Sequence, residues 1–234
     1  MINLSIGRDN DLARERWVKE SLNKIPAGLK ILDAGAGQKR YKQACAHLEY
    51  ISQDFAKYDG EGDGAGFQQG TWDQTGLDIV SDIISIPVPD SSFDAVMCVE
   101  VFEHLPNPIL AIKEFSRILK PGGYLIITAP FASGVHFAPY YYCTGFSKYF
   151  YDYHLPLNNF KISEFTTNGS YFSYLAQELR RLPLMAKKYS GVRLTLIYQL
   201  LFAPLLFILD SLNKKDKGSR EFMSFGSQVL ARKI

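Results

Sequence analysis

Cysteine and net charge are both scarce in this chain. It has three cysteines in 234 residues, Cys45, Cys98 and Cys143, and its formal net charge is +2. An odd number of widely spaced cysteines suits neither a disulfide framework nor a zinc site, so we expect a reducing compartment and no metal. The small charge argues against a nucleic-acid-binding protein, because such proteins bind by neutralising phosphates.

The sequence shows no signal-peptide pattern and no low-complexity segment. Residues 9–24 are charged and predict an amphipathic helix, and we therefore expect a cytoplasmic protein. Hydrophobic residues make up 47% of the chain, which excludes a disordered chain. The length allows one domain with a full core.

What the sequence does contain is a glycine-rich turn after a short apolar run. Residues 31–37 read Ile-Leu-Asp-Ala-Gly-Ala-Gly, and a helix-like stretch is predicted from about Lys39 to His47. Glycine lets the chain turn tightly and lets a ligand approach the backbone. Strand, glycine turn and helix in this order are typical of nucleotide-binding sites, although a buried strand ending in Asp-X-Gly also occurs without a ligand.

Further apolar runs follow, each with a polar residue at or near its end. They cover residues 50–54, 79–83, 93–100 and 124–130. A helix is predicted between the last two, because Asn107 can cap it, Pro108 suits its first turn and the Lys-Pro-Gly-Gly at 120–123 ends it. Strands and helices that alternate in this way predict an α/β fold, with a doubly wound parallel sheet covered by helices on both faces.

Six motifs in this order resemble those of class I S-adenosylmethionine-dependent methyltransferases. They are Leu32–Gly37, Asp54, Asp82-Ile83 with Ile86-Pro87, Ser92–Val96, Glu100–Leu105 and Leu119–Leu125, and they cover roughly residues 25–135. The chain departs from the family's glycine pattern at Lys39. The resemblance implies a seven-stranded, mostly parallel Rossmann-like sheet with an antiparallel last strand, for which residues 221–230 are the candidate.

The same resemblance implies the cofactor, S-adenosyl-L-methionine, and residues that hold its methionine end. It places Asp33 near that end, where the carboxylate would orient a water or the cofactor amine. Gly35 and Gly37 would give the cofactor room. The backbone near Cys98 and Glu100 would line the side of the sulfonium.

Three further residues are implied for the adenosine end. Asp54 would hold the ribose hydroxyls, Asp82 would face the adenine amine, and Ile83 would pack on the adenine ring. From the residues alone, Asp54 and Asp82 could instead be ordinary turn residues at strand ends.

Two segments go beyond a minimal fold of this kind. Residues 58–76 contain six glycines, which prevent a helix and predict a long loop. This loop could cover the adenosine, form a wall of the acceptor site, or be a plain surface loop. An apolar helical insertion is predicted at about 170–215. With both insertions, we expect a single class I methyltransferase domain over residues 1–234.

The apolar run at 194–212 has the length of a membrane span, but it contains Pro204 and precedes a strand that must return to the sheet. Basic residues flank it: Lys187, Lys188, Arg193, Lys214, Lys215, Lys217 and Arg220. We therefore expect one helix, or two broken at Pro204, with an apolar face that its own chain does not fully cover. The run could be a buried helix or the contact of a homodimer. It could instead rest on an anionic membrane surface, which would place the protein at the inner face of a membrane.

The candidate catalytic residues are His104 and His136, because imidazole titrates near neutrality and can take a proton from an acceptor hydroxyl. His136 lies in an aromatic stretch, residues 131–154, whose start should overhang the cofactor methyl or pack in the core. Glu-His-Leu at 103–105 recurs in the family whatever the substrate, so His104 could be structural. Glu103 could face solvent or cap a turn.

The predicted function is methyl transfer to an oxygen of a sugar or surface-glycan precursor. The basic flanks, the apolar run and a loose likeness to methyltransferases of bacterial surface-polysaccharide pathways favour this acceptor. One alternative is a diffusible metabolite or natural product as acceptor, and another is a cofactor-binding protein without catalysis. The partners expected are thus a small-molecule or glycan acceptor and no nucleic acid. A dehydrogenase fits less well, since residues 100–104 and 121–123 have no role there.

Overall fold

The structure is a computed structural model that describes residues 5–194 and 196–234. Its contacts divide the chain into two compact units. One consists of the start of the chain through Arg14 together with Thr167–Phe225, and the other of Glu15–Thr166 together with Gly226–Ile234. The second unit contains all the motifs of the predicted site.

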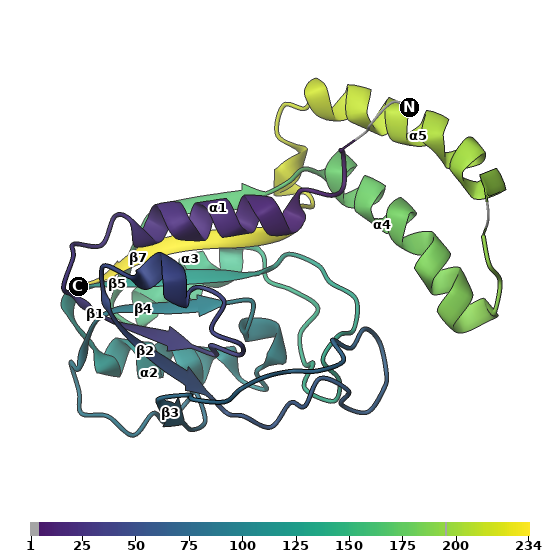
Figure 1. The fold of residues 1–234 in the computed structure, drawn as a ribbon. Helices are drawn as coiled ribbons and strands as arrows, with labels where there is room; N and C mark the ends of the chain where they lie inside the picture. Colours follow the sequence, from purple (N-terminus) through teal and green to yellow (C-terminus); the bar gives the residue numbers. More distant parts are fainter. Residues whose placement is uncertain (1–4, 195) are drawn as a thin grey trace. The chain divides into compact units, whose positions relative to one another are not determined.

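A seven-stranded sheet runs through the structure (Figure 1), with the strand order β3-β2-β1-β4-β5-β7-β6. The strands are β1 (Lys30–Ala34), β2 (Glu49–Asp54), β3 (Ile79–Val80), β4 (Phe93–Val99), β5 (Leu119–Pro130), β6 (Phe160–Asn168) and β7 (Gly226–Lys233). Strands β1 to β5 pair in parallel, and β7 runs antiparallel to β5. The predicted doubly wound sheet with an antiparallel last strand is therefore confirmed.

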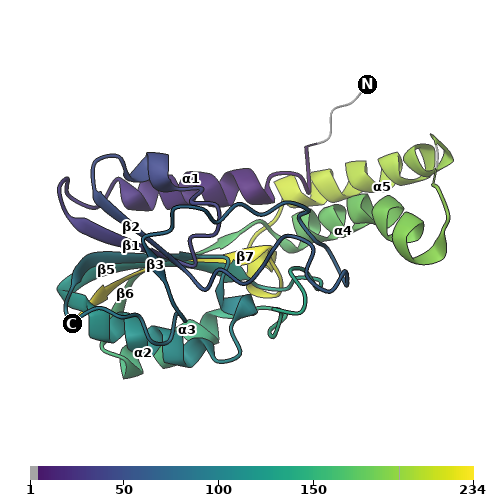
Figure 2. The same cartoon turned by 60° about the horizontal axis from the view of Figure 1, so that its bottom comes forward.

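Helices cover both faces of the sheet, α1 (Asn10–Leu22) on one and α2 (Pro108–Ile118) with α3 (Lys148–Leu157) on the other (Figure 2). Successive side chains of a strand point to opposite faces. Thus Ile31 belongs to the core under α1, whereas Leu32 belongs to the core under α2 and α3. Both side chains are fully buried, which explains why the strand reads as a continuous apolar run.

The predicted helix at 39–47 is wrong in extent. Only Lys42–Cys45 is helical, as the 3₁₀ helix η1. Lys39 has a φ of +57°, which a right-handed helix does not allow, and β2 begins at Glu49. Too few residues remain between them for a stable α-helix.

Three other predicted boundaries are also wrong. Strand β3 ends at Val80 instead of residue 83, because it pairs only with the end of β2. Helix α2 ends at Ile118, and residues 120–123 belong to β5. The last strand begins at Gly226 instead of residue 221, because its partner β5 ends at Pro130, which pairs with Gly226.

The unit that includes Thr167–Phe225 contains two long helices, α4 (Tyr171–Met185) and α5 (Leu196–Lys214), joined through a π-helical turn at Ala186–Ser190. A small core with Ile6, Ala176 and Leu209 holds them together. Helix α5 is continuous through Pro204, so the first of the two predicted forms, a single helix, is the one found. Thr195, which belongs to the predicted apolar run, lies outside the described residues. Among the described residues, no helix is long and apolar enough to cross a membrane.

Candidate functional site

The glycine turn after β1 is fixed by hydrogen bonds to the end of β2. The amides of Gly35 and Ala36 donate to the carbonyl oxygen of Gln53 at 2.9 and 2.8 Å. Gly35 and Gly37 have φ values of +78° and +50°, a region that side chains disfavour. A Cβ at Gly35 would lie 2.5 Å from Val101, and one at Gly37 would lie 2.7 Å from the Trp72 ring. Both glycines are thus required by the turn and by close neighbours.

Asp33 ends β1 as a buried carboxylate beside this turn. The hydroxyl of Tyr50 donates to its Oδ2 at 2.6 Å. Burial raises the pKa of Asp33 to about 7, against the opposing effect of the Tyr50 hydrogen bond. Among the described residues, no donor reaches its Oδ1. That oxygen remains available for a donor from a ligand.

Asp54 ends β2 and organises three surrounding segments. Its Oδ2 accepts a hydrogen bond from the Gly37 amide at 2.9 Å. Its Oδ1 accepts from the Ala56 amide at 3.0 Å and from the Gln74 side chain at 2.9 Å. Asp54 is therefore more than a turn residue, because it links the glycine turn to the loop that contains Gln74.

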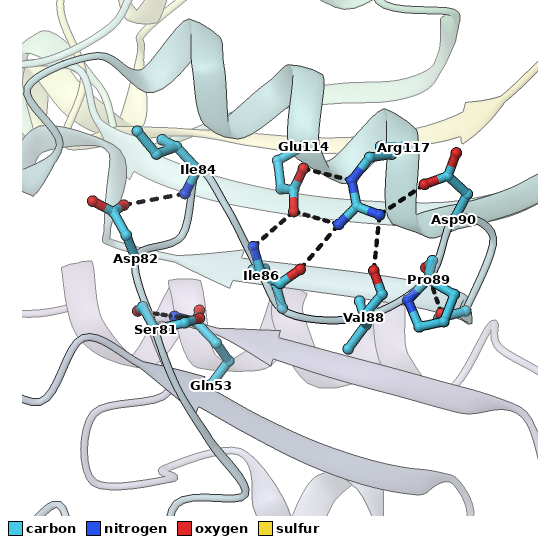
Figure 3. A network of polar contacts seen from close by, with 11 residues as sticks. Gln53, Ser81, Asp82, Ile84, Ile86, Val88, Pro89, Asp90, Glu114 and Arg117 are labelled. Carbon is cyan, nitrogen blue, oxygen red and sulfur yellow. Dashed lines mark hydrogen bonds and ion pairs between the residues drawn. The ribbon is translucent and has the colours of Figure 1, made fainter.

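Asp82 and Ile83 follow the short strand β3. Asp82 is exposed and accepts a hydrogen bond from the Ile84 amide at 3.2 Å, whereas the Ile83 side chain is buried in the core with α2. Their assignment to adenine stays a prediction. The neighbouring Ser81 is held by Gln53, whose side-chain nitrogen donates to the Ser81 carbonyl at 2.7 Å (Figure 3).

A charge pair on α2, between the buried Glu114 and the half-buried Arg117, holds the rest of this segment (Figure 3). Glu114 accepts from the Ile86 amide at 2.7 Å, and Arg117 donates to both Glu114 oxygens at 2.7 and 2.8 Å. Arg117 also donates to the carbonyls of Ile86 and Val88 and to the Asp90 carboxylate. Hydrogen bonds to the side chain of Glu114 raise the pKa of Arg117, which stays charged. This pair fixes the path of the chain after Asp82.

Cys98 and Glu100 lie at the end of β4. The Cys98 thiol is buried in the core, and burial raises its pKa, so it is not a reactive thiolate. Glu100 has a φ of +55° and accepts from the Thr128 hydroxyl at 2.8 Å. The backbone turns at Glu100, directly before Val101 packs against Gly35.

His104 and His136 lie next to each other, with ring centres 4.7 Å apart. His104 belongs to the 3₁₀ helix η2 (Phe102–His104), and His136 lies in the loop after β5. Between them is Glu103, whose Oε1 is 3.7 Å from Nε2 of each ring. Glu103 is fully buried, so the expectation that it faces solvent is wrong.

Burial shifts the protonation of this cluster. It raises the pKa of Glu103 to about 7 and lowers the pKa of His104 to about 4, with the second imidazole adding to the shift of His104. Burial also lowers the pKa of His136, but the adjacent Glu103 carboxylate outweighs it and the net shift is upward. His104 is therefore neutral at physiological pH.

The glycine-rich loop at 58–76 packs on the loop that contains His136. The Phe67 amide donates to the Val135 carbonyl at 2.9 Å, and the Phe137 amide donates back to the Phe67 carbonyl at 3.0 Å. The Tyr58 ring stacks on Phe137 with centroids 4.6 Å apart, and Phe137 stacks on His104 at 5.1 Å. The loop thus forms part of the surroundings of the two histidines and is more than an isolated surface loop.

The hydrogen-bond acceptors at the ends of β1 and β2 fit S-adenosylmethionine. An amino-acid ammonium needs a carboxylate oxygen without a donor, which Asp33 Oδ1 provides. Ribose hydroxyls need an acceptor, and Asp54 can provide one if a hydroxyl replaces the Gln74 side chain. Sequence reasoning missed Tyr50, Trp72 and Gln74, because nothing local marks them.

Comparison with known proteins matches the segment that contains these residues to a domain family. Residues 32–127 match the family described as methyltransferase domain. A sterol 24-C-methyltransferase of Gibberella zeae is 30% identical over 130 residues, which are 49% of this chain and 31% of that protein. A ubiquinone biosynthesis O-methyltransferase of Leptothrix cholodnii is 25% identical over 118 residues, 49% of each chain. The matched segment thus spans half or less of these relatives.

Solved structures agree on the fold. A SAM-dependent methyltransferase from Archaeoglobus fulgidus superimposes with a TM-score of 0.57 at 15% identity, covering 96% of this chain and 94% of that one. Residues 32–127 therefore form a methyltransferase domain, and the chain has the fold of class I S-adenosylmethionine-dependent methyltransferases. This family implies S-adenosyl-L-methionine as the cofactor.

Proposed function

We propose that this protein transfers a methyl group from S-adenosylmethionine to an oxygen of a sugar in a surface-glycan precursor. The observation that carries methyl transfer is the convergence of Asp33, the glycine turn and Asp54 at the carboxyl ends of β1 and β2, inside the segment that matches the methyltransferase domain. Ligands of doubly wound sheets bind at this edge.

Asp33 and Asp54 are proposed to hold the two ends of the cofactor, which supplies an activated methyl group when it is bound. Asp33 is proposed to accept from the amino group and Asp54 from the ribose hydroxyls. Asp82 and Ile83 are assigned to the adenine, and the turn at Glu100 to the sulfonium side. The main requirement is then to align the acceptor oxygen and to exclude water.

The histidine pair is proposed to help the acceptor oxygen lose its proton. Val101 packs against Gly35, and Glu103 and His104 follow it closely in the chain, so the histidine pair lies near the glycine turn. Phe137 stacks on His104, Tyr58 stacks on Phe137, and these rings reduce the access of water to the pair. His104 and His136 are thus the candidate bases for a hydroxyl acceptor.

The acceptor is proposed to be attached to a membrane lipid, because α5 exposes apolar side chains. Leu200 and Leu201 are 76% and 68% exposed. The basic side chains around 187–193 and 214–220 are also exposed, and bases favour anionic lipid. One relative is named for a sterol and another for the biosynthesis of ubiquinone. Sterols and ubiquinone are apolar molecules, which supports an acceptor at a membrane surface. We propose that α5 rests on such a surface.

A labelled-methyl assay tests the function. Purified protein and S-adenosylmethionine with an isotopically labelled methyl group are incubated with a lipid-linked glycan extract and, separately, with a soluble metabolite extract. Mass spectrometry is expected to find a gain of one labelled methyl in the glycan fraction. His104→Ala and His136→Ala should lower turnover by about 10²–10⁴ and keep cofactor affinity.

The outcomes separate the alternatives. A labelled product only in the soluble extract would support a diffusible metabolite or natural product as acceptor. Cofactor binding without a product in either extract would support a binding protein without catalysis. Normal turnover in both histidine variants would contradict their assignment as bases.

A further inference from the structure

Glu103 is the buried polar side chain that the fold leaves least satisfied. Its side chain is 1% exposed, and neither of its carboxylate oxygens has a hydrogen-bond partner among the described residues. An ionised carboxylate buried without donors is costly, so something must compensate for it. The imidazoles of His104 and His136 each place Nε2 3.7 Å from its Oε1.

Both imidazoles direct the same ring nitrogen toward Glu103. Nδ1 of His104 lies 2.6 Å from the Tyr140 carbonyl, and Nδ1 of His136 lies 2.9 Å from the Gly134 carbonyl. A carbonyl can only accept, so each Nδ1 carries the hydrogen. In a neutral imidazole, Nε2 then has a free lone pair. In other proteins, a hydrogen bond from Nδ1 to a carbonyl oxygen orients histidines that bind a metal through Nε2.

The three ligand atoms are close enough for one ion. One ligand atom from each of Glu103, His104 and His136 lies within 4.8 Å of the other two, and Nε2 of each ring is 3.7 Å from Oε1 of Glu103. Ligands bound to one tetrahedral ion at about 2.0–2.1 Å lie roughly 3.3 Å apart. Each nitrogen–oxygen distance exceeds this value by a small margin, so binding one ion requires only a modest closure between Glu103 and each ring.

We propose that Glu103, His104 and His136 form a binding site for a divalent transition-metal ion, with Zn²⁺ as the best match. Two imidazoles and one carboxylate are a typical donor set for zinc that keeps a further position open. Mg²⁺ prefers oxygen ligands in octahedral geometry and fits poorly. The site uses no cysteine, and for this reason the cysteine count did not reveal it.

The metal site does not depend on methyl transfer, but it would change the role of the histidines. The open position could bind an acceptor oxygen, and a hydroxyl beside a divalent cation loses its proton more readily. That consequence rests on the proposed function. In the metal-bound protein, His104 and His136 would then act as ligands and the ion would promote loss of the proton.

Metal titration of the full chain tests the site. Chelator-treated protein is titrated calorimetrically with Zn²⁺ and, in parallel, with Mg²⁺. One Zn²⁺ per chain is expected, with no comparable binding of Mg²⁺. Glu103→Gln, His104→Ala and His136→Ala are each expected to weaken Zn²⁺ binding at least about tenfold. His47→Ala, a half-buried histidine on a different part of the fold, is the matched control and should bind normally.

X-ray absorption spectroscopy of the zinc-loaded wild-type protein provides a measurement that needs no variant. Two imidazole nitrogens and at least one oxygen in the coordination sphere are expected. Zn²⁺ binding that survives in both histidine variants, or a sphere with fewer than two imidazoles, would overturn the proposal. So would a wild-type protein that binds no Zn²⁺, because a proton shared between Glu103 and His136 would then account for the cluster.

Discussion

At the scale of single residues, the carboxylate of Asp33 should make cofactor binding depend on pH. Its pKa is raised to about 7 because it is buried. The ionised form accepts a much stronger, charge-assisted hydrogen bond from an amine than the neutral acid does, so affinity is highest above this pKa and falls as pH drops through it. We expect the dissociation constant of S-adenosylmethionine to rise by up to about tenfold per pH unit below pH 7.

Calorimetry between pH 5.5 and 7.5 measures this effect. Asp33→Asn keeps the size of the side chain and removes the titration, so its weaker affinity should be flat over the same range. A wild-type affinity that does not change with pH would mean that Asp33 does not bind the amine.

Asp54 allows a second test at this scale. Asp54→Ala should weaken S-adenosylmethionine binding by about 1–3 kcal/mol, because it leaves the ribose hydroxyls without their acceptor. Gln74→Ala is the matched control, since it removes one neighbour of Asp54 and keeps the carboxylate. Calorimetry should find its affinity equal to or above that of the wild type. Equal losses in both variants would indicate that Asp54 only shapes the loop.

At the scale of elements, α2 holds the segment after β3 through Glu114 and Arg117. Arg117→Met should lower the free energy of unfolding by about 1–3 kcal/mol, because the buried Glu114 loses its charge-assisted hydrogen bonds. Both tryptophans, Trp17 and Trp72, lie in the unit that contains α2, so fluorescence during urea unfolding reports on it.

A surface arginine serves as the control for this variant. Arg40 forms an exposed ion pair with Glu15, and Arg40→Met should change stability by less than about 1 kcal/mol. If both variants have the same unfolding midpoint, the network around Ile86 and Val88 contributes nothing measurable.

At the scale of the whole molecule, the exposed apolar side of α5 should mediate membrane contact. The protein is expected to float with anionic vesicles and much less with neutral ones, because each base near the surface adds roughly 1 kcal/mol. Salt should weaken this binding. Leu200→Ser with Leu201→Ser should abolish it, since these are the most exposed leucines of the described part of α5.

Leu157→Ser is the control, because Leu157 is 66% exposed at the end of α3 and should not affect flotation. Light scattering is measured alongside. A stable dimer that ignores vesicles would show that a second copy covers α5. A monomer that ignores both vesicle types would remove the main support for a membrane-bound acceptor.

The sequence by itself determined the sheet and its class. The apolar runs, the Asp-X-Gly-X-Gly turn and the cap at Asn107 are local signals, because they act through neighbouring backbone groups. Asp33 and Asp54 could be picked out for the same reason, since each stands at the end of a strand. The comparisons confirm a methyltransferase domain over residues 32–127 and its fold, while the role of each residue stays a prediction.

Only the tertiary structure decided what surrounds these residues. It brought Glu103 between His104 and His136, placed Trp72 against Gly37, and tied the segment after Asp82 to Arg117. It also shortened β3 and moved the start of β7, because a strand extends only as far as its partner. These contacts join residues far apart in the chain, and they depend on side-chain packing that no local pattern encodes.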